Sequence, residues 1–190
     1  MTPITYTPRK LVKPLRMPTV PTAWTGNELI IEDLIERFQI APKRCIEFGV
    51  QHGHSTAALA NYFTHVIGVD TFAGDEMAGI GDPEHTFIGT QEALKDFPNI
   101  TLARTSYQDW IRKDDSLYDL CHIDVVHTYE DTYTCADWAV SHTDVTILHD
   151  TQSFPDVMYA CKAIAEDWNL YLYNYPHQHG LGILSRREII

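Results

Sequence analysis

The chain has 190 residues, of which 44% are hydrophobic and 21% are charged. This composition is that of an ordinary globular protein, so it excludes a disordered or collagen-like chain, and the length favours one main domain. The net charge of −12 argues against a general nucleic-acid binder, because binding to a phosphate backbone needs a basic surface.

Residues 1–25 differ from the rest of the chain, and we expect them to form an extended, proline-rich arm. Their five prolines fix the backbone and bias each preceding residue toward extended conformations. Residues 1–27 carry four basic side chains and no acidic one. The arm is therefore either a solvated tail, which is the interpretation we favour, or a strap on an acidic surface. That surface could belong to its own domain or to a second copy in a homo-oligomer.

Residues 26–190 are expected to form the folded domain. A capping box, Thr25 with Glu28, predicts a helix whose apolar side chains follow at helical spacing. From residue 44 onward, short apolar runs alternate with helical patterns, which is typical of a parallel sheet with crossover helices. The predicted strands are 45–50, 65–70, 100–103, 118–123, 145–148, 169–173 and 181–184. The predicted helices between them are 55–62, 91–97, 107–112, 129–140 and 155–168.

The last two predicted strands are joined by a loop too short to hold a crossover helix, so they should form an antiparallel hairpin. The complete prediction is an α/β fold with a Rossmann-like, doubly wound, mostly parallel sheet of seven strands. The C-terminal hairpin lies at one edge of this sheet, and the arm precedes the fold.

The cysteines indicate the compartment. Cys45, Cys121, Cys135 and Cys161 show no CxxC spacing, and they fit reduced thiols in the core of a cytoplasmic protein. The chain has no apolar run of the roughly 20 residues that a membrane span needs and no signal-like segment. We therefore expect a cytoplasmic protein without a membrane partner.

The first turn that could bind a ligand follows the strand at 45–50. Gly49 and Gly53 allow backbone conformations and close approaches that other residues cannot adopt, although tight packing of a strand against a helix also requires glycine. Asp70 follows about 20 residues later, at the end of the next strand, where open α/β sheets place an acid that binds ribose hydroxyls. An isolated Asp70 could instead cap a turn.

Two further strands end in acids and histidines. Asp124 and His127 follow the strand at 118–123, and His149 and Asp150 follow the strand at 145–148. The carboxyl ends of neighbouring parallel strands meet at one edge of the sheet, so we expect these groups to share one crevice. Such a grouping is typical of a cofactor, a metal or proton transfer, with His127 as the candidate general base.

These motifs resemble the class I S-adenosylmethionine-dependent methyltransferases, and among them the O-methyltransferases of small molecules from carbohydrate and natural-product pathways. The resemblance spans about residues 44–185. Its pieces are Glu47-Phe48-Gly49 with Gly53-His54-Ser55, Gly68-Val69-Asp70-Thr71-Phe72 with Gly74-Asp75-Glu76, His122-Ile123-Asp124 with His127-Thr128-Tyr129-Glu130, His149-Asp150-Thr151, and His179-Gly180-Leu181-Gly182.

The resemblance implies a role for each matching position. The loop residues Glu47, Phe48, Gly49, Gly53, His54 and Ser55 would hold the amino-acid end of S-adenosylmethionine. Asp70, followed by Thr71, would bind the ribose, and Thr105 and Ser106 would lie beside the adenine. Asp124 would face the sulfonium, and His127 would take the proton from an acceptor hydroxyl.

Some relatives also bind a divalent cation between acids that match Asp124 and Asp150, which makes Mg²⁺ a candidate second cofactor. Thr151, however, stands where metal-using relatives have Asp or Asn, so the ligand set is incomplete. The expected acceptor is a hydroxyl of a sugar or other small polar metabolite. Residues 73–89, an irregular segment long enough for a lid, and the final hairpin would select it.

Two other functions stay open at this point. The histidines and acids at 122–127 and 149–150 could form a His/carboxylate metal centre for hydrolysis or oxygen chemistry. The fold could also serve as an inactive scaffold whose arm wraps a neighbouring copy.

Overall fold

The computed structural model describes residues 1–74 and 79–190. Asp75 and Glu76, which belong to one of the methyltransferase-like motifs, lie outside the described residues. The strands are β1 (Ile4–Thr5), β2 (Arg44–Phe48), β3 (His65–Asp70), β4 (Ile100–Arg104), β5 (Leu120–Ile123), β6 (Val145–His149), β7 (Tyr171–Tyr175) and β8 (Leu181–Ser185). The helices are η1 (Asn27–Ile30), α1 (Ile31–Arg37), α2 (His54–Ala60), α3 (Pro83–Ala93), α4 (Tyr107–Ile111), α5 (Tyr129–His142) and α6 (Pro155–Asp167).

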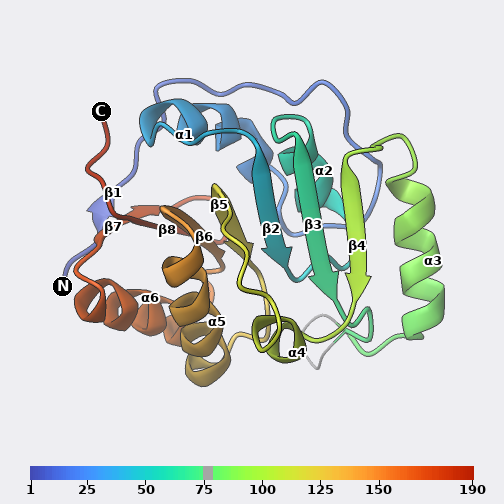
Figure 1. Ribbon diagram of the computed structural model, residues 1–190. Helices are drawn as coiled ribbons and strands as arrows, with labels where there is room; N and C mark the ends of the chain where they lie inside the picture. The colour runs from blue at the N-terminus through green and yellow to red at the C-terminus, as the bar shows by residue number, and fades with distance from the viewer. Residues whose placement is uncertain (75–78) are drawn as a thin grey trace.

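All described strands join one sheet in the order β1-β7-β8-β6-β5-β2-β3-β4 (Figure 1). β8 runs antiparallel to both β6 and β7, and every other pair is parallel. The mostly parallel sheet and the C-terminal hairpin are therefore confirmed. The sheet has one strand more than predicted, because Ile4 and Thr5 of the arm pair with Tyr173 and Asn174 of β7.

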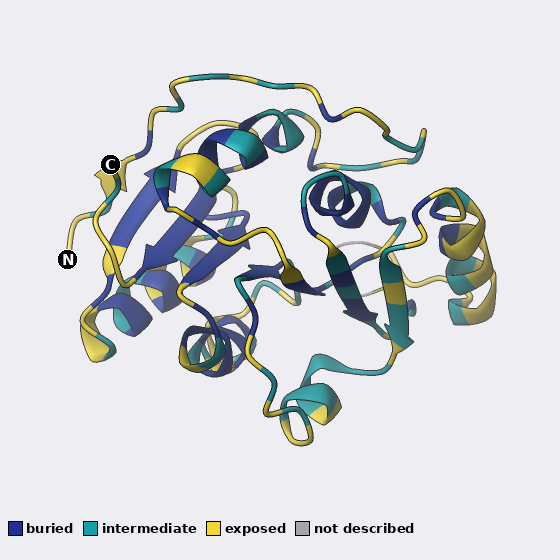
Figure 2. Ribbon diagram, turned by 45° about the horizontal axis from the view of Figure 1, so that its top comes forward, coloured by how far each residue is buried: buried dark blue, intermediate teal, exposed yellow. Residues whose placement is uncertain are grey.

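Helices cover both faces of the sheet, as in other doubly wound folds (Figures 1 and 2). Alternate residues of each strand pack on opposite faces. Cys45 and Ile147 belong to a core with η1, α1 and α2, whereas Ile46 and Leu148 belong to a core with α5 and α6. The four cysteines are buried free thiols, as predicted.

The arm lies on its own domain, so our favoured interpretation of it as a solvated tail is wrong. The carboxylate of Asp33 on α1 accepts hydrogen bonds from the Tyr6 hydroxyl and from the backbone amides of Arg9 and Lys10. Tyr6 and Asp33 are each 1% exposed. The alternative of a basic strap on an acidic surface describes these contacts, since Lys10 also pairs with Glu32 at 2.7 Å.

The predicted capping box does not form. The helical segment begins with the 3₁₀ turn η1, whose N-cap is Gly26, and no side chain caps it. Glu28 instead accepts a hydrogen bond at 2.6 Å from the amide of Gly26. The N-cap position is taken by Gly26, which adopts φ = 100°. Glycine adopts this left-handed conformation readily, and a β-branched residue such as threonine does not.

The helix predicted at 91–97 is also misplaced, because α3 spans Pro83–Ala93. Asp82 caps it by accepting from the amide of Glu84, and Pro83 occupies the first turn, where a missing N–H costs nothing. The irregular segment that we expected at 73–89 therefore ends at Asp82. No helix among the described residues is long and apolar enough to cross a membrane.

Candidate active site

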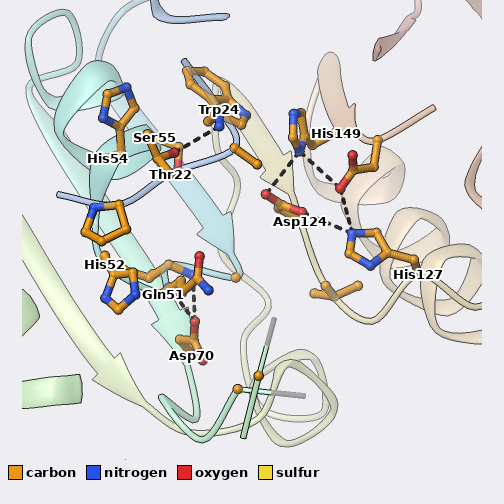
Figure 3. A pocket seen from close by; sticks show the side chains of 18 of the residues that line it. Thr22, Trp24, Gln51, His52, His54, Ser55, Asp70, Asp124, His127 and His149 are labelled. Carbon is orange, nitrogen blue, oxygen red and sulfur yellow. Dashed lines mark hydrogen bonds and ion pairs between the residues drawn. The ribbon is translucent and has the colours of Figure 1, made fainter. Parts of the chain in front are cut away.

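A cavity of about 700 Å³ opens at the carboxyl ends of β2, β3, β5 and β6. Successive strands are added to the sheet in one direction from β2 to β4 and in the other direction from β5 to β6. The point between β2 and β5 is therefore the switch point, where open α/β sheets bind their ligands. Its size is in the range of cavities that hold small molecules and cofactors. Figure 3 shows Asp70 and Gln51 toward one end of the cavity and Trp24 with His149 toward the other.

The loop after β2 forms one wall of the cavity. Asp70 organises it: one carboxylate oxygen accepts from the amides of Val50 and Gln51 at 2.8 and 2.7 Å, and the other accepts from the amide of Phe72 at 2.7 Å. Asp70 thus faces the cavity while it fixes the turns at the ends of two strands. Both interpretations of Asp70, as a ligand-binding acid and as a turn cap, fit this placement.

Glycine is required in this loop for packing. Gly49 has φ = 92°, and a Cβ placed on it would lie 1.8 Å from the backbone oxygen of Asp124. A Cβ on Gly53 would lie 2.8 Å from the side chain of Leu94. Close approach to the end of β5 therefore requires glycine at position 49, and close approach to the end of α3 requires it at position 53.

Two carboxylates and two imidazoles form a cluster across β5 and β6 (Figure 3). His127 Nε2 lies 2.8 Å from a carboxylate oxygen of Asp150 and 3.5 Å from one of Asp124. His149 Nδ1 lies 3.3 Å from both carboxylates. The predicted acids and histidines therefore meet in one place, as expected from neighbouring strand ends.

The cluster shifts the pKa values of its members. Burial would raise the pKa of both carboxyl groups, but hydrogen bonds from His127 and His149 outweigh it, leaving the pKa of Asp124 well below its ordinary value and that of Asp150 at about 2. Burial lowers the pKa of the imidazoles, yet Asp124 and Asp150 raise it to about 9 for His127 and about 10 for His149. At neutral pH the cluster therefore consists of two ion pairs.

The surroundings hold these side chains in position. The His127 ring stacks on Phe154 at a centroid distance of 4.2 Å and an angle of 13°. Asp150 has φ = 66°, a left-handed conformation that is uncommon outside glycine and is often found at functional sites. His149 Nε2 donates to the carbonyl of Gln178 at 3.3 Å, which links the cluster to the β7–β8 turn.

The predicted site residues fall into two groups. The first group lines the cavity: Gly49, His54, Ser55, Asp70, Asp124, His127 and Asp150. The second group does not line it: Glu47, Phe48, Gly53, Thr71, Thr105 and Ser106. Glu47 and Phe48 are fully buried within the sheet, and Ser106 caps α4 by accepting from the amide of Asp109.

Glu47 has a different partner from the one that the resemblance implied. Its carboxylate accepts from the Thr56 hydroxyl and, at 2.8 Å, from His122 Nδ1. All three side chains are fully buried. Glu47 and His122 therefore connect β2, β5 and α2 beneath the cavity, and they do not reach its surface.

Other cavity residues were not anticipated from the sequence. Pro21, Thr22, Ala23 and Trp24 bring the arm into the wall, Phe154 comes from the start of α6, and Ser153 forms a hydrogen bond of 2.9 Å with His179 of the hairpin. A large aromatic residue, Trp24, just before a predicted helix indicates that this end of the arm packs against the domain. No local pattern in the sequence indicates that the arm folds back over the sheet.

One group of three residues has the composition of a metal site. Asp124, His127 and Asp150 offer ligand atoms that lie within 4.8 Å of one another. Thr151 could not complete the set, because its hydroxyl is buried and donates to Asn174 at 2.6 Å. The third potential donor beside the two acids is therefore His127 and not Thr151.

Comparisons with known proteins agree with this arrangement. The family model described as "Methyltransferase domain" matches residues 46–151, more than half of the chain. The uncharacterized protein y4gI of Sinorhizobium fredii (strain NBRC 101917 / NGR234) is 30% identical in an alignment of 160 residues, and the alignment covers 76% of this chain. The chain spans only 17% of the length of that relative.

Solved structures share the fold at low identity. The O-methyltransferase NovP has a TM-score of 0.64 at 12% identity, covering 85% of this chain and 78% of its own. The SAH-bound methyltransferase PaMTH1 of Podospora anserina has a TM-score of 0.59 at 10% identity, covering 76% and 72%. Together with the family match, which includes the loop after β2, Asp70 and the acid-histidine cluster, they lead to one conclusion: the chain belongs to the family of class I S-adenosylmethionine-dependent methyltransferases.

Proposed function

We propose that this protein transfers a methyl group from S-adenosylmethionine to a hydroxyl of a sugar or another small polar metabolite. The observation that carries the proposal is one continuous cavity that joins the loop after β2 and Asp70 to the cluster of Asp124, His127, His149 and Asp150. One end thus has the groups expected for a cofactor, and the other has groups that can handle a proton.

The residues present fit the cofactor. Asp70 can accept from ribose hydroxyls at the rim of the cavity, and Ser55 and His54 lie at the other side of the same loop. When bound, S-adenosylmethionine supplies an electrophilic methyl group on a sulfonium. The contribution of the chain is to hold the cofactor and the acceptor in line, which by itself provides much of the rate enhancement in such reactions.

His127 is the proposed base for the acceptor hydroxyl. Its pKa of about 9 means that Nε2 carries a proton at neutral pH. Only about 1% of the molecules then have an unprotonated Nε2 that can accept a proton from the acceptor. Stacking on Phe154 orients the ring in either state, and the ion pair with Asp150 holds it while Nε2 carries a proton. The turnover rate should therefore increase with pH up to about 9.

A divalent cation such as Mg²⁺ is a second proposed ligand of this site. Asp124 and Asp150 could hold it beside His127, and its chemistry would be to lower the pKa of the acceptor hydroxyl. A cation and the protons on the imidazoles would compete for the same two carboxylates. The proposal is therefore tested together with cofactor binding.

The decisive experiment is calorimetric titration of S-adenosylmethionine and S-adenosylhomocysteine into wild type and Asp70→Ala, each with EDTA or with Mg²⁺. We expect micromolar binding by wild type and at least tenfold weaker binding by the variant. Asp115→Ala is the control, because Asp115 is exposed and lies outside the cavity. Absence of binding by wild type under both conditions would contradict the proposed function. Equal rates of methyl transfer with EDTA and with Mg²⁺ would contradict the proposed role of the cation.

A further inference from the structure

The turn between β7 and β8 contributes His179 to the wall of the cavity. His177, two residues earlier in the same turn, does not line the cavity, although both side chains are exposed. The ring of His177 forms a T-shaped contact with Tyr175 at a centroid distance of 5.1 Å. The ring of His179 forms such a contact with His149 at 6.1 Å. His179 therefore lies at the end of the cavity that holds the cluster of acids and histidines.

The backbone holds His179 in this place in an uncommon conformation. Gln178 and His179 have φ values of 51° and 68°, so two successive residues other than glycine are left-handed. Such residues raise the energy of the backbone, and they are often found at functional sites. The carbonyl oxygen of His179 accepts from the amides of Gln152 and Ser153 at 2.8 and 3.3 Å. These two bonds fix the turn against the segment that follows Asp150.

The side chain of His179 is oriented as well. Its Nδ1 shares a hydrogen bond of 2.9 Å with the Ser153 hydroxyl. Its Nε2 has no hydrogen bond in the part of the chain that the structure describes, and the exposed ring lines the cavity. Ser153 is followed by Phe154, on which the His127 ring stacks. One short segment thus orients two imidazoles at the same end of the cavity, the proposed base and a ring whose second nitrogen is available to a ligand.

The chemistry of an imidazole nitrogen limits which group His179 can bind. If the Ser153 hydroxyl donates to Nδ1, then Nε2 carries the hydrogen and donates to a ligand. If Nδ1 donates to Ser153, then Nε2 accepts from a ligand. A carboxylate or phosphate fits only the first tautomer, and an ammonium fits only the second. A hydroxyl both donates and accepts, so it is the group that fits Nε2 in either tautomer.

We infer that His179, oriented by Ser153, binds a second hydroxyl of the acceptor, so that the enzyme methylates one hydroxyl of a polyhydroxylated molecule. This inference rests on the proposed function and narrows its acceptor. In the reaction, the acceptor oxygen bonds to the methyl carbon, the carbon–sulfur bond breaks to give S-adenosylhomocysteine, and the hydroxyl proton goes to His127 Nε2. His179 is an acceptor-binding residue, and it takes no part in binding the cofactor.

The test measures methyl transfer from labelled S-adenosylmethionine to two sets of probes. The polyhydroxylated probes are methyl glycosides of common hexoses and deoxyhexoses, and the monohydroxy probes are cyclohexanol and cyclohexylmethanol. The variants are His179→Asn, Ser153→Ala and, as the matched control in the same turn, His177→Asn. Asparagine tolerates a left-handed backbone, so His179→Asn keeps the turn. Its side chain is too short to place a polar atom where Nε2 lies.

We expect wild type to methylate at least one glycoside and neither monohydroxy alcohol. His179→Asn should raise the KM for that glycoside about 5- to 10-fold, as expected for the loss of one hydrogen bond between neutral groups, and leave kcat within about twofold. Ser153→Ala keeps the imidazole without its hydrogen-bond partner and should raise KM by a smaller factor. His177→Asn should match wild type. All four proteins should bind S-adenosylhomocysteine with the same affinity in calorimetry.

Several outcomes would overturn the inference. They are an unchanged KM in His179→Asn, a loss of S-adenosylhomocysteine affinity in that variant, transfer by wild type to the monohydroxy alcohols, and no transfer to any glycoside by wild type that binds the cofactor. If circular dichroism shows that His179→Asn folds poorly, Ser153→Ala decides, and an unchanged KM in it would count against the inference. Absence of cofactor binding by wild type would instead contradict the proposed function, and this inference with it.

Discussion

The two ion pairs of the cavity determine how single residues respond to pH. An unfolded histidine titrates near 6.5, whereas the pKa of the folded chain is about 9 for His127 and about 10 for His149. Their pairing therefore stabilises the fold fully below pH 6.5, and this contribution is lost as the pH rises through 9 and 10. Asp150 has a lowered pKa of about 2, so its contribution is present above about pH 4 and is lost as the pH falls toward 2.

Asp150→Asn tests these pairs. The substitution removes one of the two negative charges that hold the protons, so the pKa of both imidazoles should fall. We expect the free energy of unfolding of wild type to decrease more steeply between pH 6 and pH 9.5 than that of the variant, measured by urea unfolding. Asp115→Asn, at an exposed position without a hydrogen bond in the described chain, should behave like wild type. Identical pH slopes for all three proteins would argue against the raised pKa values.

His127→Ala tests the base. Because His127 lies at the cluster end of the cavity, its loss should reduce methyl transfer at least about 100-fold, the usual share of a general base, and leave the affinity for S-adenosylhomocysteine within about twofold. The measurement is methyl transfer to pooled sugar and phenol acceptors alongside calorimetry. Equal loss of affinity and turnover would assign His127 to cofactor binding.

Gly49 and Gly89 make a matched pair of substitutions. A Cβ at Gly49 would overlap the Asp124 backbone oxygen, so Gly49→Ala should lower the free energy of unfolding by roughly 2–5 kcal/mol. Gly89 lies in α3, and an alanine methyl group there would meet open space, so Gly89→Ala should raise stability by about 0.5–1 kcal/mol. Urea unfolding of both variants measures the difference, and a neutral Gly49→Ala would show that the strand ends separate readily.

At the scale of elements, the arm depends on one buried carboxylate. Asp33 on α1 accepts from the Tyr6 hydroxyl and from two arm amides, so Asp33→Ala leaves three donors without their partner. We expect a loss of about 2–4 kcal/mol and faster tryptic cleavage after Arg9 and Lys10. Glu36→Ala removes only an exposed partner of Lys10 and should cost less than about 1 kcal/mol. Equal cleavage rates in the two variants would mean that Asp33 does not hold the arm.

In the molecule as a whole, the arm covers part of the hydrophobic core. Tyr6 stacks with Phe38, which in turn contacts Tyr173 of β7, so the arm shields part of the core next to the sheet edge. A chain that begins at Thr22 should therefore unfold at lower urea concentration and self-associate more than the full chain, measured by light scattering. Leu15→Ala, at an arm position that is 91% exposed, should match wild type. If the full chain were an oligomer and the shortened chain a monomer, the arm would instead bind a partner copy.

Sequence alone determined the features that depend on neighbours along the chain. Alternating apolar runs and helical patterns predicted the parallel strands and the hairpin, and strand ends predicted that Asp70, Asp124, His127 and Asp150 share one edge, because parallel strands place their carboxyl ends together. The helix α3 was misplaced although Asp82 and Pro83 signal its start, since only Thr90 of that helix is buried and its apolar residues form no clear stripe.

Only the tertiary structure decided the features that join distant segments. The partners of Glu47 are 9 and 75 residues away. Trp24 meets the cavity because the backbone of Tyr6 bonds to Asn174, and Asn27 and Gly26 contact Gln178. The raised pKa values of His127 and His149 also arise from distances between two strands and from burial. Local propensity carries no information on such contacts, because their energy depends on which surfaces the folded chain brings together.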